Sequence, residues 1–263
     1  MRTSDQHPDI SFEVDGHVAV VEIQRPPHNY FDQTLIAGLA GIFEALDGDG
    51  RCRAIVLTAQ GKSFCAGADH SRSNPANALG SDQQAPPHIY HEAIRLFRTK
   101  TPVVAAIHGA ATGGGLGLAL SADFRVTCPS ARFWANFSRL GLHAGFGLTV
   151  TLPRLVGAQR AAALLYSGRR VNGDEAVALG LADILVGDEE VRSRAVALAG
   201  EIALAAPLSV RSMRNSLRQG FAEAVESAMQ SELAEQTWQR RTQDFTEGVR
   251  AMAERRPPVF IGQ

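Results

Sequence analysis

The chain has 263 residues, with 26 lysine and arginine residues against 27 aspartate and glutamate residues, which gives a formal net charge of −1 at pH 7. This balance argues against a general nucleic-acid-binding protein, which needs a dense basic face. Hydrophobic residues make up 45% of the chain and charged residues 20%, as in ordinary globular proteins. No apolar run reaches the ~18–20 residues of a membrane span.

The first segment and the cysteines bear on the cellular compartment. Residues 1–10 lack a basic region followed by an apolar one, so we expect no secretory signal. Cys52, Cys65 and Cys128 are odd in number and have no close spacing. They are typical of reduced thiols rather than of a disulfide frame or a zinc site, which predicts a cytoplasmic protein.

The N-terminal part begins as a β-hairpin. Asp15-Gly16 is a two-residue turn signal between segments that are rich in valine and isoleucine. Apolar residues at helical spacing follow, with Asp32 as the expected N-cap. A continuously apolar run then predicts a strand that is covered on both faces. The expected elements are strands at 10–14 and 17–24, a helix over 35–46 and a strand at 54–58.

The middle of the chain alternates between loops, helices and strands. The polar stretch 71–87 contains three prolines and predicts a long loop. The elements expected after it are a helix near 88–100, strands at 102–107, 124–127 and 184–186, and a helix over 116–121.

From residue 189 onward the pattern becomes wholly helical. Helices are expected over 189–206, 208–218, 223–241 and 246–255. Pro207 marks the change from a mixed α/β pattern. We therefore predict an α/β core of residues 1–206 and a C-terminal helical region of residues 207–263.

Several familiar catalytic motifs do not occur. The chain has no GxSxG nucleophile elbow, no HExxH zinc helix and no Walker motif, and GGGLG at 113–117 does not complete GxGxxG. His88 and His91 lie three residues apart on a predicted helix and could both ligate a metal. No neighbouring cysteines or carboxylates support such a site, so no metal is predicted.

Two segments carry the chemistry. Residues 62–69 (KSFCAGAD) follow the first buried strand, and residues 107–117 (IHGAATGGGLG) follow the second. A glycine run that opens a helix leaves its first N–H groups unpaired at the positive end of the helix dipole. Each motif alone is better explained as a tight turn with close packing. Together, at adjacent ends of parallel strands, they can direct two backbone N–H groups at one oxygen, which is an oxyanion hole.

SFCAGAD followed by HGAATGGGLGLALSADFRV resembles the crotonase superfamily, the enoyl-CoA hydratase/isomerase group. The resemblance covers nearly the whole chain, from residues 23–26 through 152–157 (LPRLVG) to 254–257 (ERRP). It implies an α/β fold, a spiral of ββα units with a C-terminal helical trimerisation region. It also implies acyl-CoA substrates, with no cofactor beyond the coenzyme A of the substrate. It further implies a homotrimer or a hexamer formed as a dimer of trimers. From the charge balance and the lack of a long apolar run, we expect no nucleic-acid or membrane partner.

The same resemblance implies roles for individual residues. The backbone N–H groups of Ala68 and Gly114 would hold the thioester oxygen as it becomes an enolate. A basic residue at Arg255 would meet the nucleotide end of coenzyme A. The remaining positions at which the family contacts coenzyme A or substrate are His28, Asn29, Ala66, Asp69, His70 and Phe137.

The sequence departs from the hydratase pattern at the acidic positions. Gly117 and Phe137 stand where typical hydratases have their two glutamates, and Gly145 stands where dienoyl-CoA isomerases have an aspartate. Acid–base catalysis by carboxylates at these positions is therefore not available. The aroyl-CoA dehalogenase branch has glycine and an aromatic residue at the first two positions, but its nucleophilic aspartate would also fall at Gly145.

Other groups remain as candidates for proton transfer. His143 lies in a glycine-rich loop that borders the family's acyl pocket, and it is either a base or acid or a histidine bonded to the backbone. Asp69 abuts the oxyanion hole and is either catalytic or a helix N-cap. Tyr90 and His91 lie on the helix that lines the pocket in the family, but surface exposure is the favoured expectation for each. Aromatic residues that form either an acyl pocket or ordinary core packing are Phe133, Trp134, Phe137 and Phe146.

Three functions fit this pattern. The first is an enzyme of the lyase or isomerase type that acts on an acyl-CoA thioester with reassigned catalytic groups, His143 and Asp69 among them. The second is a non-catalytic acyl-CoA-binding paralogue, which the missing glutamates favour. The third is a purely structural oligomer subunit.

Overall fold

The computed structural model describes residues 7–68 and 89–263. The strands are β1 (Ile10–Asp15), β2 (Val18–Ile23), β3 (Ala54–Ala59), β4 (Ser63–Cys65), β5 (Val103–Ile107), β6 (Ala110–Thr112), β7 (Phe124–Thr127), β8 (Arg132–Trp134), β9 (Arg170–Asn172) and β10 (Ile184–Leu185). The helices are α1 (Gln33–Gly48), α2 (Tyr90–Phe97), α3 (Gly114–Ser121), α4 (Leu148–Val156), α5 (Ala158–Ser167), α6 (Gly173–Leu179), α7 (Val191–Ala203), α8 (Pro207–Leu217), α9 (Phe221–Gln239) and α10 (Gln243–Glu254), with 3-10 turns η1 (Asn136–Leu140) and η2 (Asp188–Glu190).

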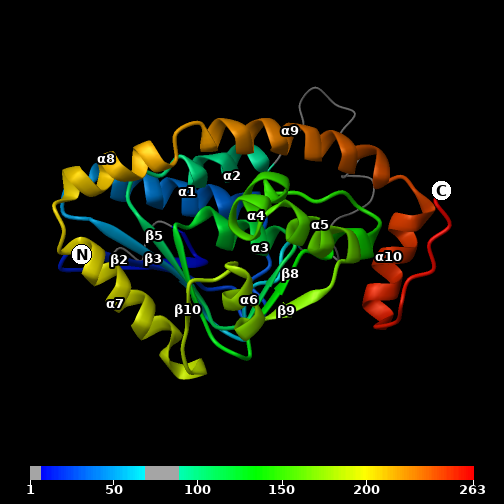
Figure 1. Cartoon of the computed structure of the whole chain (residues 1–263), viewed down its shortest axis with the longest axis horizontal. Coiled ribbons are helices and arrows are strands. Elements are labelled where there is room, and N and C mark those ends of the chain that lie inside the picture. The colour runs from blue at the N-terminus through cyan, green and yellow to red at the C-terminus, as the bar shows by residue number, and fades with distance from the viewer. Residues whose placement is uncertain (1–6, 69–88) are drawn as a thin grey trace.

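A six-stranded sheet in the order β1-β2-β3-β5-β7-β10 holds the centre of the core. The β1–β2 pair is the predicted antiparallel hairpin, and the remaining pairs are parallel. Every residue of β3 and β5 is buried, which explains why both strands are continuously apolar in sequence. Helix α7 packs against β2, β3, β5 and β7 (Figure 1).

A second sheet in the order β4-β6-β8-β9 brings the two glycine-rich segments together. The sequence predicts that both segments directly follow the buried strands β3 and β5. In the structure each first forms a short strand of this second sheet, β4 or β6, and these two strands pair in parallel. Because parallel neighbours end at the same edge, the residues after Cys65 and after Thr112 lie side by side.

The C-terminal helices pack along one side of the molecule. Helix α9 crosses the top in Figure 1 and packs on α2 and α4, and α10 lies at the right and packs on η1. Phe221 and Val225 of α9 are buried, whereas Leu208 of α8 is 82% exposed and Leu217 is 74% exposed. The apolar positions of this region therefore divide into a set covered within the chain and a set left at its surface.

Two local predictions agree with the structure, the N-cap of α1 and the start of a helix at Pro207. Asp32 caps α1, since its Oδ1 accepts a hydrogen bond of 2.9 Å from the backbone N–H of Leu35. Helix α8 begins at Pro207, where a change of pattern was expected, and the domain boundary near residue 206 stays a prediction. The predicted loop at 71–87, and His88 with it, lie outside the described residues.

All three cysteines are free and buried, and burial raises the pKa of Cys52 to about 11 and that of Cys65 to about 12.

Within the described ranges, no single helix has the length and apolarity to cross a bilayer, although residues 188–203 and 207–217, bent by 106°, pass that test as a pair.

Candidate active site

A cavity of about 560 Å³ lies where the loops after β4 and β6 meet η1, α2, α9 and α10. We refer to it as the acyl cavity. Its lining is mainly apolar and aromatic, with a few polar groups, as is usual for small-molecule sites. The lining residues are Tyr30, Phe31, Ala66, Gly67, Ala68, Ile89, Tyr90, Thr112, Gly113, Gly114, Trp134, Asn136, Phe137, Leu140, Leu142, Phe146, Gln236, Arg240, Val249, Met252 and Ala253.

Two glycines shape the loops at the entrance to α3. Gly67 has a φ of 89° and Gly113 a φ of 56°, both in the left-handed region that favours glycine. A Cβ on Gly67 would lie 2.8 Å from the carbonyl oxygen of Thr112 and 3.7 Å from the backbone nitrogen of Gly114. The two loops are therefore in direct contact, and only a residue without a side chain fits between them.

The backbone N–H groups of Ala68 and Gly114 lie next to this contact, since each residue directly follows one of the two glycines. Across residues 7–68 and 89–263, neither N–H donates to a protein acceptor. The neighbouring N–H of Gly113 is used, since it donates to the carbonyl of Trp134 at 2.8 Å. Ala68 and Gly114, which both line the acyl cavity, thus each have a backbone N–H without an acceptor among the described residues, as an oxyanion site requires.

Phe146 occupies the space beside Gly117, the first of the expected acidic positions. A Cβ on Gly117 would lie 2.6 Å from the Cβ of Phe146. The Phe146 ring packs on Phe31, with ring centroids 5.5 Å apart, and on Tyr90 at 6.3 Å. At the second position the ring of Phe137 lines the acyl cavity. Of the expected aromatic pocket, Trp134, Phe137 and Phe146 line the acyl cavity, and Phe133 is buried in the core instead.

Tyr90 and Gln236 occupy the space beside Gly145, the third expected acidic position. A Cβ on Gly145 would overlap the Tyr90 hydroxyl oxygen and lie 2.5 Å from Gln236 Nε2. The Tyr90 hydroxyl donates to Gln236 Oε1 at 3.3 Å, and Gln236 Nε2 donates to the carbonyl of His143 at 2.9 Å. Burial raises the pKa of Tyr90 to about 12. The expectation that Tyr90 is a surface residue is wrong, because packing against α9 and Phe146 turns its side chain inward, whereas His91 is exposed.

His143 faces a different cavity from the one that contains Ala68 and Gly114. Its ring lines a neighbouring space together with Pro153 and Tyr166. Its Nδ1 lies 2.8 Å from the carbonyl oxygen of Ala144, and its backbone N–H donates to the side chain of Gln239. This geometry matches the alternative of a loop histidine bonded to the backbone.

The positions expected to contact coenzyme A fall into distinct groups. Ala66 lines the acyl cavity beside Ala68. Asn29 is buried outside it, and its Nδ2 donates to the carbonyls of Gln60 at 2.6 Å and Ser63 at 2.7 Å. Its side chain therefore holds the loop that carries the oxyanion residues.

The remaining expected contacts lie outside the acyl cavity or outside the described chain. His28 is exposed, with Nδ1 3.3 Å from Ser63 Oγ. Arg255 is exposed at the C-terminus of α10 and does not line the acyl cavity. Asp69 and His70 lie outside the described residues.

Sequence reasoning missed Arg240, which caps the C-terminus of α9 and lines the acyl cavity. Burial lowers its pKa, and the nearby Tyr90 offsets part of that effect. Gln236 lies one helical turn before Arg240, so the spacing indicates one shared face of a helix. Nothing in the sequence indicates that this face looks into the acyl cavity.

No carboxylate and no imidazole belongs to the acyl cavity's lining among the described residues. The titratable side chains that do line it are Tyr30, Tyr90 and Arg240. The described chain also shows no cluster of histidine, cysteine, aspartate and glutamate side chains that could hold a metal ion. Any proton transfer by the described lining therefore depends on phenol groups or on water.

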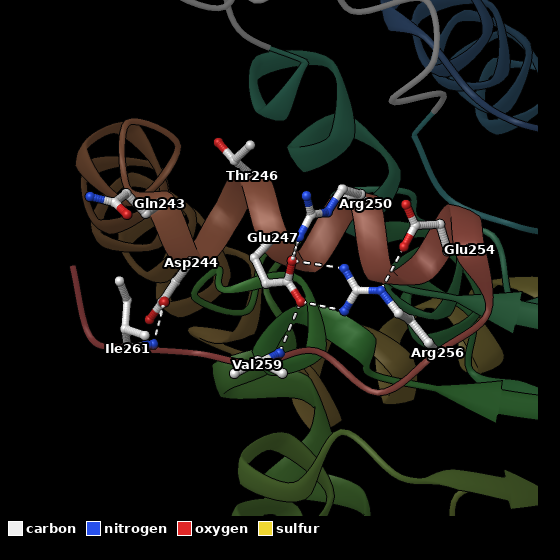
Figure 2. Close-up of a pocket in the computed structure, with 9 residues that line it drawn as sticks. All are labelled: Gln243, Asp244, Thr246, Glu247, Arg250, Glu254, Arg256, Val259 and Ile261. Atoms are coloured by element: carbon white, nitrogen blue, oxygen red, sulfur yellow. Dashed lines mark hydrogen bonds and ion pairs between the residues drawn. The ribbon is translucent and has the colours of Figure 1, made fainter.

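A second hollow lies beneath α10, and the charged side chains that line it bond to one another (Figure 2). Glu247 accepts hydrogen bonds from Arg256 at 2.5 and 2.9 Å, from Arg250 at 2.8 Å and from the backbone N–H of Val259 at 2.9 Å. These bonds, led by those from Arg256, hold the pKa of Glu247 well below its usual range. The carboxylate thus fastens the C-terminal tail to α10, and none of these residues lines the acyl cavity.

The chain is similar to known proteins along nearly its full length. A family model described as enoyl-CoA hydratase/isomerase matches residues 13–263. The chain is 32% identical over 257 residues to a crotonyl-CoA hydratase of Syntrophomonas wolfei, covering 97% of this chain and 98% of that protein. It is 33% identical over 261 residues to an (E)-benzylidenesuccinyl-CoA hydratase of Thauera aromatica, covering 96% and 99%. A crystal structure of an enoyl-CoA hydratase/isomerase from Pseudoalteromonas atlantica superposes with a TM-score of 0.85 at 29% identity, covering 96% of this chain and 100% of that one.

Proposed function

The chain belongs to the enoyl-CoA hydratase/isomerase family, and from that premise we propose that it binds an acyl-CoA thioester and catalyses a lyase- or isomerase-type reaction through an enolate. The thioester oxygen would accept hydrogen bonds from the backbone N–H groups of Ala68 and Gly114. The acyl group would extend into the acyl cavity. Coenzyme A is part of the substrate, and no further cofactor is proposed.

The observation that carries this proposal is a pair of backbone N–H groups, at Ala68 and Gly114 in the lining of the acyl cavity, that have no acceptor among the described residues. Donors fixed in the backbone do not reorganise as negative charge develops on the thioester oxygen. Losing one such donor typically costs ~2.7–4 kcal/mol of transition-state stabilisation. A pair of donors therefore favours the enolate over the neutral thioester without any charged side chain.

The proton would come from Tyr90. Tyr90 lines the acyl cavity, and a pKa raised to about 12 by burial keeps its hydroxyl protonated near neutral pH. In a hydration, water would add at Cβ of a 2-enoyl thioester to form the enolate, and the Tyr90 hydroxyl would turn from Gln236 Oε1 to protonate Cα. The proton that the added water releases would then return to the phenolate. We assign no proton transfer to His143, whose ring lines another cavity. Whether Asp69 takes part stays a prediction from the sequence.

The coenzyme would lie along the exposed side of the oxyanion loops, by which we mean the loops after β4 and β6 that carry Ala68 and Gly114. Ala66 lines the acyl cavity next to Ala68, and its backbone N–H donates to the carbonyl of the exposed His28 at 2.9 Å. Arginine can grip a phosphate with two parallel hydrogen bonds, which suits the exposed Arg255 for the nucleotide end. Asn29 would act indirectly, by holding the loop.

We further propose that the chain assembles as a homotrimer or as a dimer of trimers. Leu204, Leu208, Met213 and Leu217 are between 58% and 88% exposed on neighbouring turns of α7 and α8. A cluster of exposed large apolar side chains of this kind is typical of an interface.

The competing function is acyl-CoA binding without catalysis. It is favoured by the described lining of the acyl cavity, which includes neither a carboxylate nor an imidazole. Binding alone would also use the N–H groups of Ala68 and Gly114. The two functions differ in whether a bound thioester is converted.

The test is a panel of thioesters assayed for binding and conversion with the same protein sample. Crotonyl-CoA, a 3-enoyl-CoA and an aromatic 2-enoyl-CoA are titrated by calorimetry and then incubated for product analysis by mass spectrometry. Binding with conversion of at least one thioester supports the enzyme. Binding of the panel without conversion supports the non-catalytic protein, and no binding at all contradicts both functions.

A further inference from the structure

One cation lines the acyl cavity without a counter-ion among the described residues. Arg240 is the cationic side chain of the described lining. Its guanidinium takes part in no ion pair or hydrogen bond with a described residue. Its carbon lies 5.8 Å from the centroid of the Phe245 ring, and Tyr90 interacts with it electrostatically. By contrast, Arg214 and Arg218, which are also largely buried, both pair with Asp123 at 2.9 Å.

The surroundings of Arg240 make this isolation costly. Val249, Met252 and Ala253 of α10 line the same cavity and offer no hydrogen-bonding side chain. A half-buried guanidinium loses part of its hydration, and burial accordingly lowers the pKa of Arg240. A buried charge is normally compensated by an opposite charge with good hydrogen-bond geometry. An anionic ligand in the acyl cavity would supply that compensation.

Polar groups beside Arg240 are suited to the same ligand. Gln236 lies one helical turn earlier on the same face of α9, and the Tyr90 hydroxyl contacts it at 3.3 Å. Both side chains line the acyl cavity with Arg240. The planar guanidinium can grip a carboxylate through two parallel hydrogen bonds, while the second amide proton of Gln236 can serve a further lone pair.

We propose that Arg240 binds a carboxylate carried by the acyl group, so that the preferred ligands are coenzyme A monothioesters of dicarboxylic acids. This inference rests on the proposed function, because it requires the thioester end to occupy Ala68 and Gly114. The acyl cavity contains both the oxyanion loops and Arg240, so one extended acyl chain can contact both. A cavity meant for a purely hydrocarbon chain would gain nothing from a guanidinium in its wall.

The alternative anion is a phosphate of coenzyme A itself. The two sources differ in what they predict for Arg240 variants. A contact with the acyl carboxylate affects only thioesters that carry one. A contact with the coenzyme affects every thioester, and free coenzyme A as well.

The experiment measures dissociation constants by calorimetry for free coenzyme A and for two carbon-matched pairs, glutaryl-CoA with pentanoyl-CoA and adipoyl-CoA with hexanoyl-CoA. The proteins are the wild type, Arg240→Leu, Arg240→Lys and a control, Arg241→Leu. Arg241 is the next residue in the chain, is exposed and does not line the acyl cavity. Retained affinity for hexanoyl-CoA reports that Arg240→Leu is folded.

We expect the wild type to bind one dicarboxylic thioester roughly 10- to 100-fold more tightly than its matched partner, as for a hydrogen-bonded charge pair. Arg240→Leu should remove this preference, Arg240→Lys should keep part of it, and Arg241→Leu should keep all of it. A wild type without the preference, or an Arg240→Leu variant that retains it, overturns the inference. So does an equal loss for all thioesters and free coenzyme A, which would assign Arg240 to the coenzyme. Tight binding of hexanoyl-CoA without preference leaves the proposed function standing, whereas no binding of any thioester contradicts both.

Discussion

A Cβ atom on Gly117 would lie 2.6 Å from the Cβ atom of Phe146. Phe146 is buried, has a φ of 60° and packs its ring against Phe31 and Tyr90. The absence of a side chain at Gly117 and the presence of a large one at Phe146 are therefore complementary. The space that a carboxylate side chain would need beside the oxyanion loops is filled by an aromatic ring.

This complementarity predicts strong energetic coupling between the two positions. Gly117→Ala should lower the free energy of unfolding by about 1–3 kcal/mol, because the added methyl group has no room beside Phe146. In a chain that already carries Phe146→Gly, which removes the Cβ atom in contact and suits the φ of 60° at this position, the same change should cost far less. Denaturant unfolding of the four proteins in a double-mutant cycle measures the coupling.

Gly41→Ala is the matched control for that cycle. Gly41 lies inside α1, and a Cβ there would meet nothing within 4 Å. Alanine should therefore stabilise this site by up to about 1 kcal/mol through helix propensity alone. Additive effects of Gly117→Ala and Phe146→Gly would contradict the packing relationship.

Tyr90→Phe tests the proposed proton donor. The change removes the hydroxyl and keeps the ring that packs against Phe146. Turnover of any thioester that the wild type converts should fall roughly 100-fold or more, with little change in the affinity for a saturated acyl-CoA. Steady-state kinetics and calorimetry measure the two effects separately. Tyr166→Phe, at a site that is 82% exposed, serves as the control, and full activity of Tyr90→Phe would exclude the phenol as donor.

His143→Ala should leave turnover within about twofold of the wild type, because general acid–base groups typically contribute at least 100-fold and this ring faces another cavity. The measurement is kcat and KM on the same thioester as above. A loss comparable to that of Tyr90→Phe would show that His143 takes part in proton transfer.

Alkaline pH should destabilise the protein. Burial raises the pKa of Cys52 from 9.0 to about 11, that of Cys65 from 9.0 to about 12 and that of Tyr90 from 10.0 to about 12. Between each ordinary value and the raised one, the folded state holds more protons than the unfolded state, so the free energy of unfolding falls as pH rises. Denaturant unfolding from about pH 8 upward should show stability constant below pH 9 and decreasing between about pH 9 and 12. An increase in stability over that window would contradict the burial of these groups.

The exposed leucines of α7 and α8 predict an oligomer. Light scattering should give the mass of three or six chains, and Leu208→Glu, which places a charge at a site that is 82% exposed, should reduce that mass. Thr246→Glu, at an exposed site on α10 away from these leucines, is the control. A monomeric wild type would contradict the proposed assembly.

The parts of the site that sequence alone could predict depend on local chain geometry. The glycine run at 113–115 and the short residues after Cys65 specify backbone turns within a few residues, and Asp32 caps its own helix in the same local way. The pairing of the two loops followed from the order of the parallel strands, although the short strands β4 and β6 that bring it about were not foreseen.

The wall of the acyl cavity could not be predicted in this way. Tyr90 and Arg240 come from helices that are far apart in sequence, and long-range packing decides which helix face turns toward the loops. His143 illustrates the converse, since its loop was placed beside the acyl pocket but the direction of its ring depends on bonds to Ala144 and Gln239. Side-chain direction in a glycine-rich loop leaves no periodic pattern to read.

The most direct test of the central claim is a crystal structure with a bound, unreactive saturated acyl-CoA. The distances from the thioester oxygen to the backbone nitrogens of Ala68 and Gly114 decide it. We predict both distances at about 2.7–3.1 Å, with the acyl chain inside the acyl cavity. A thioester oxygen outside hydrogen-bond reach of both nitrogens, or an acyl chain bound elsewhere, would contradict the proposed oxyanion site.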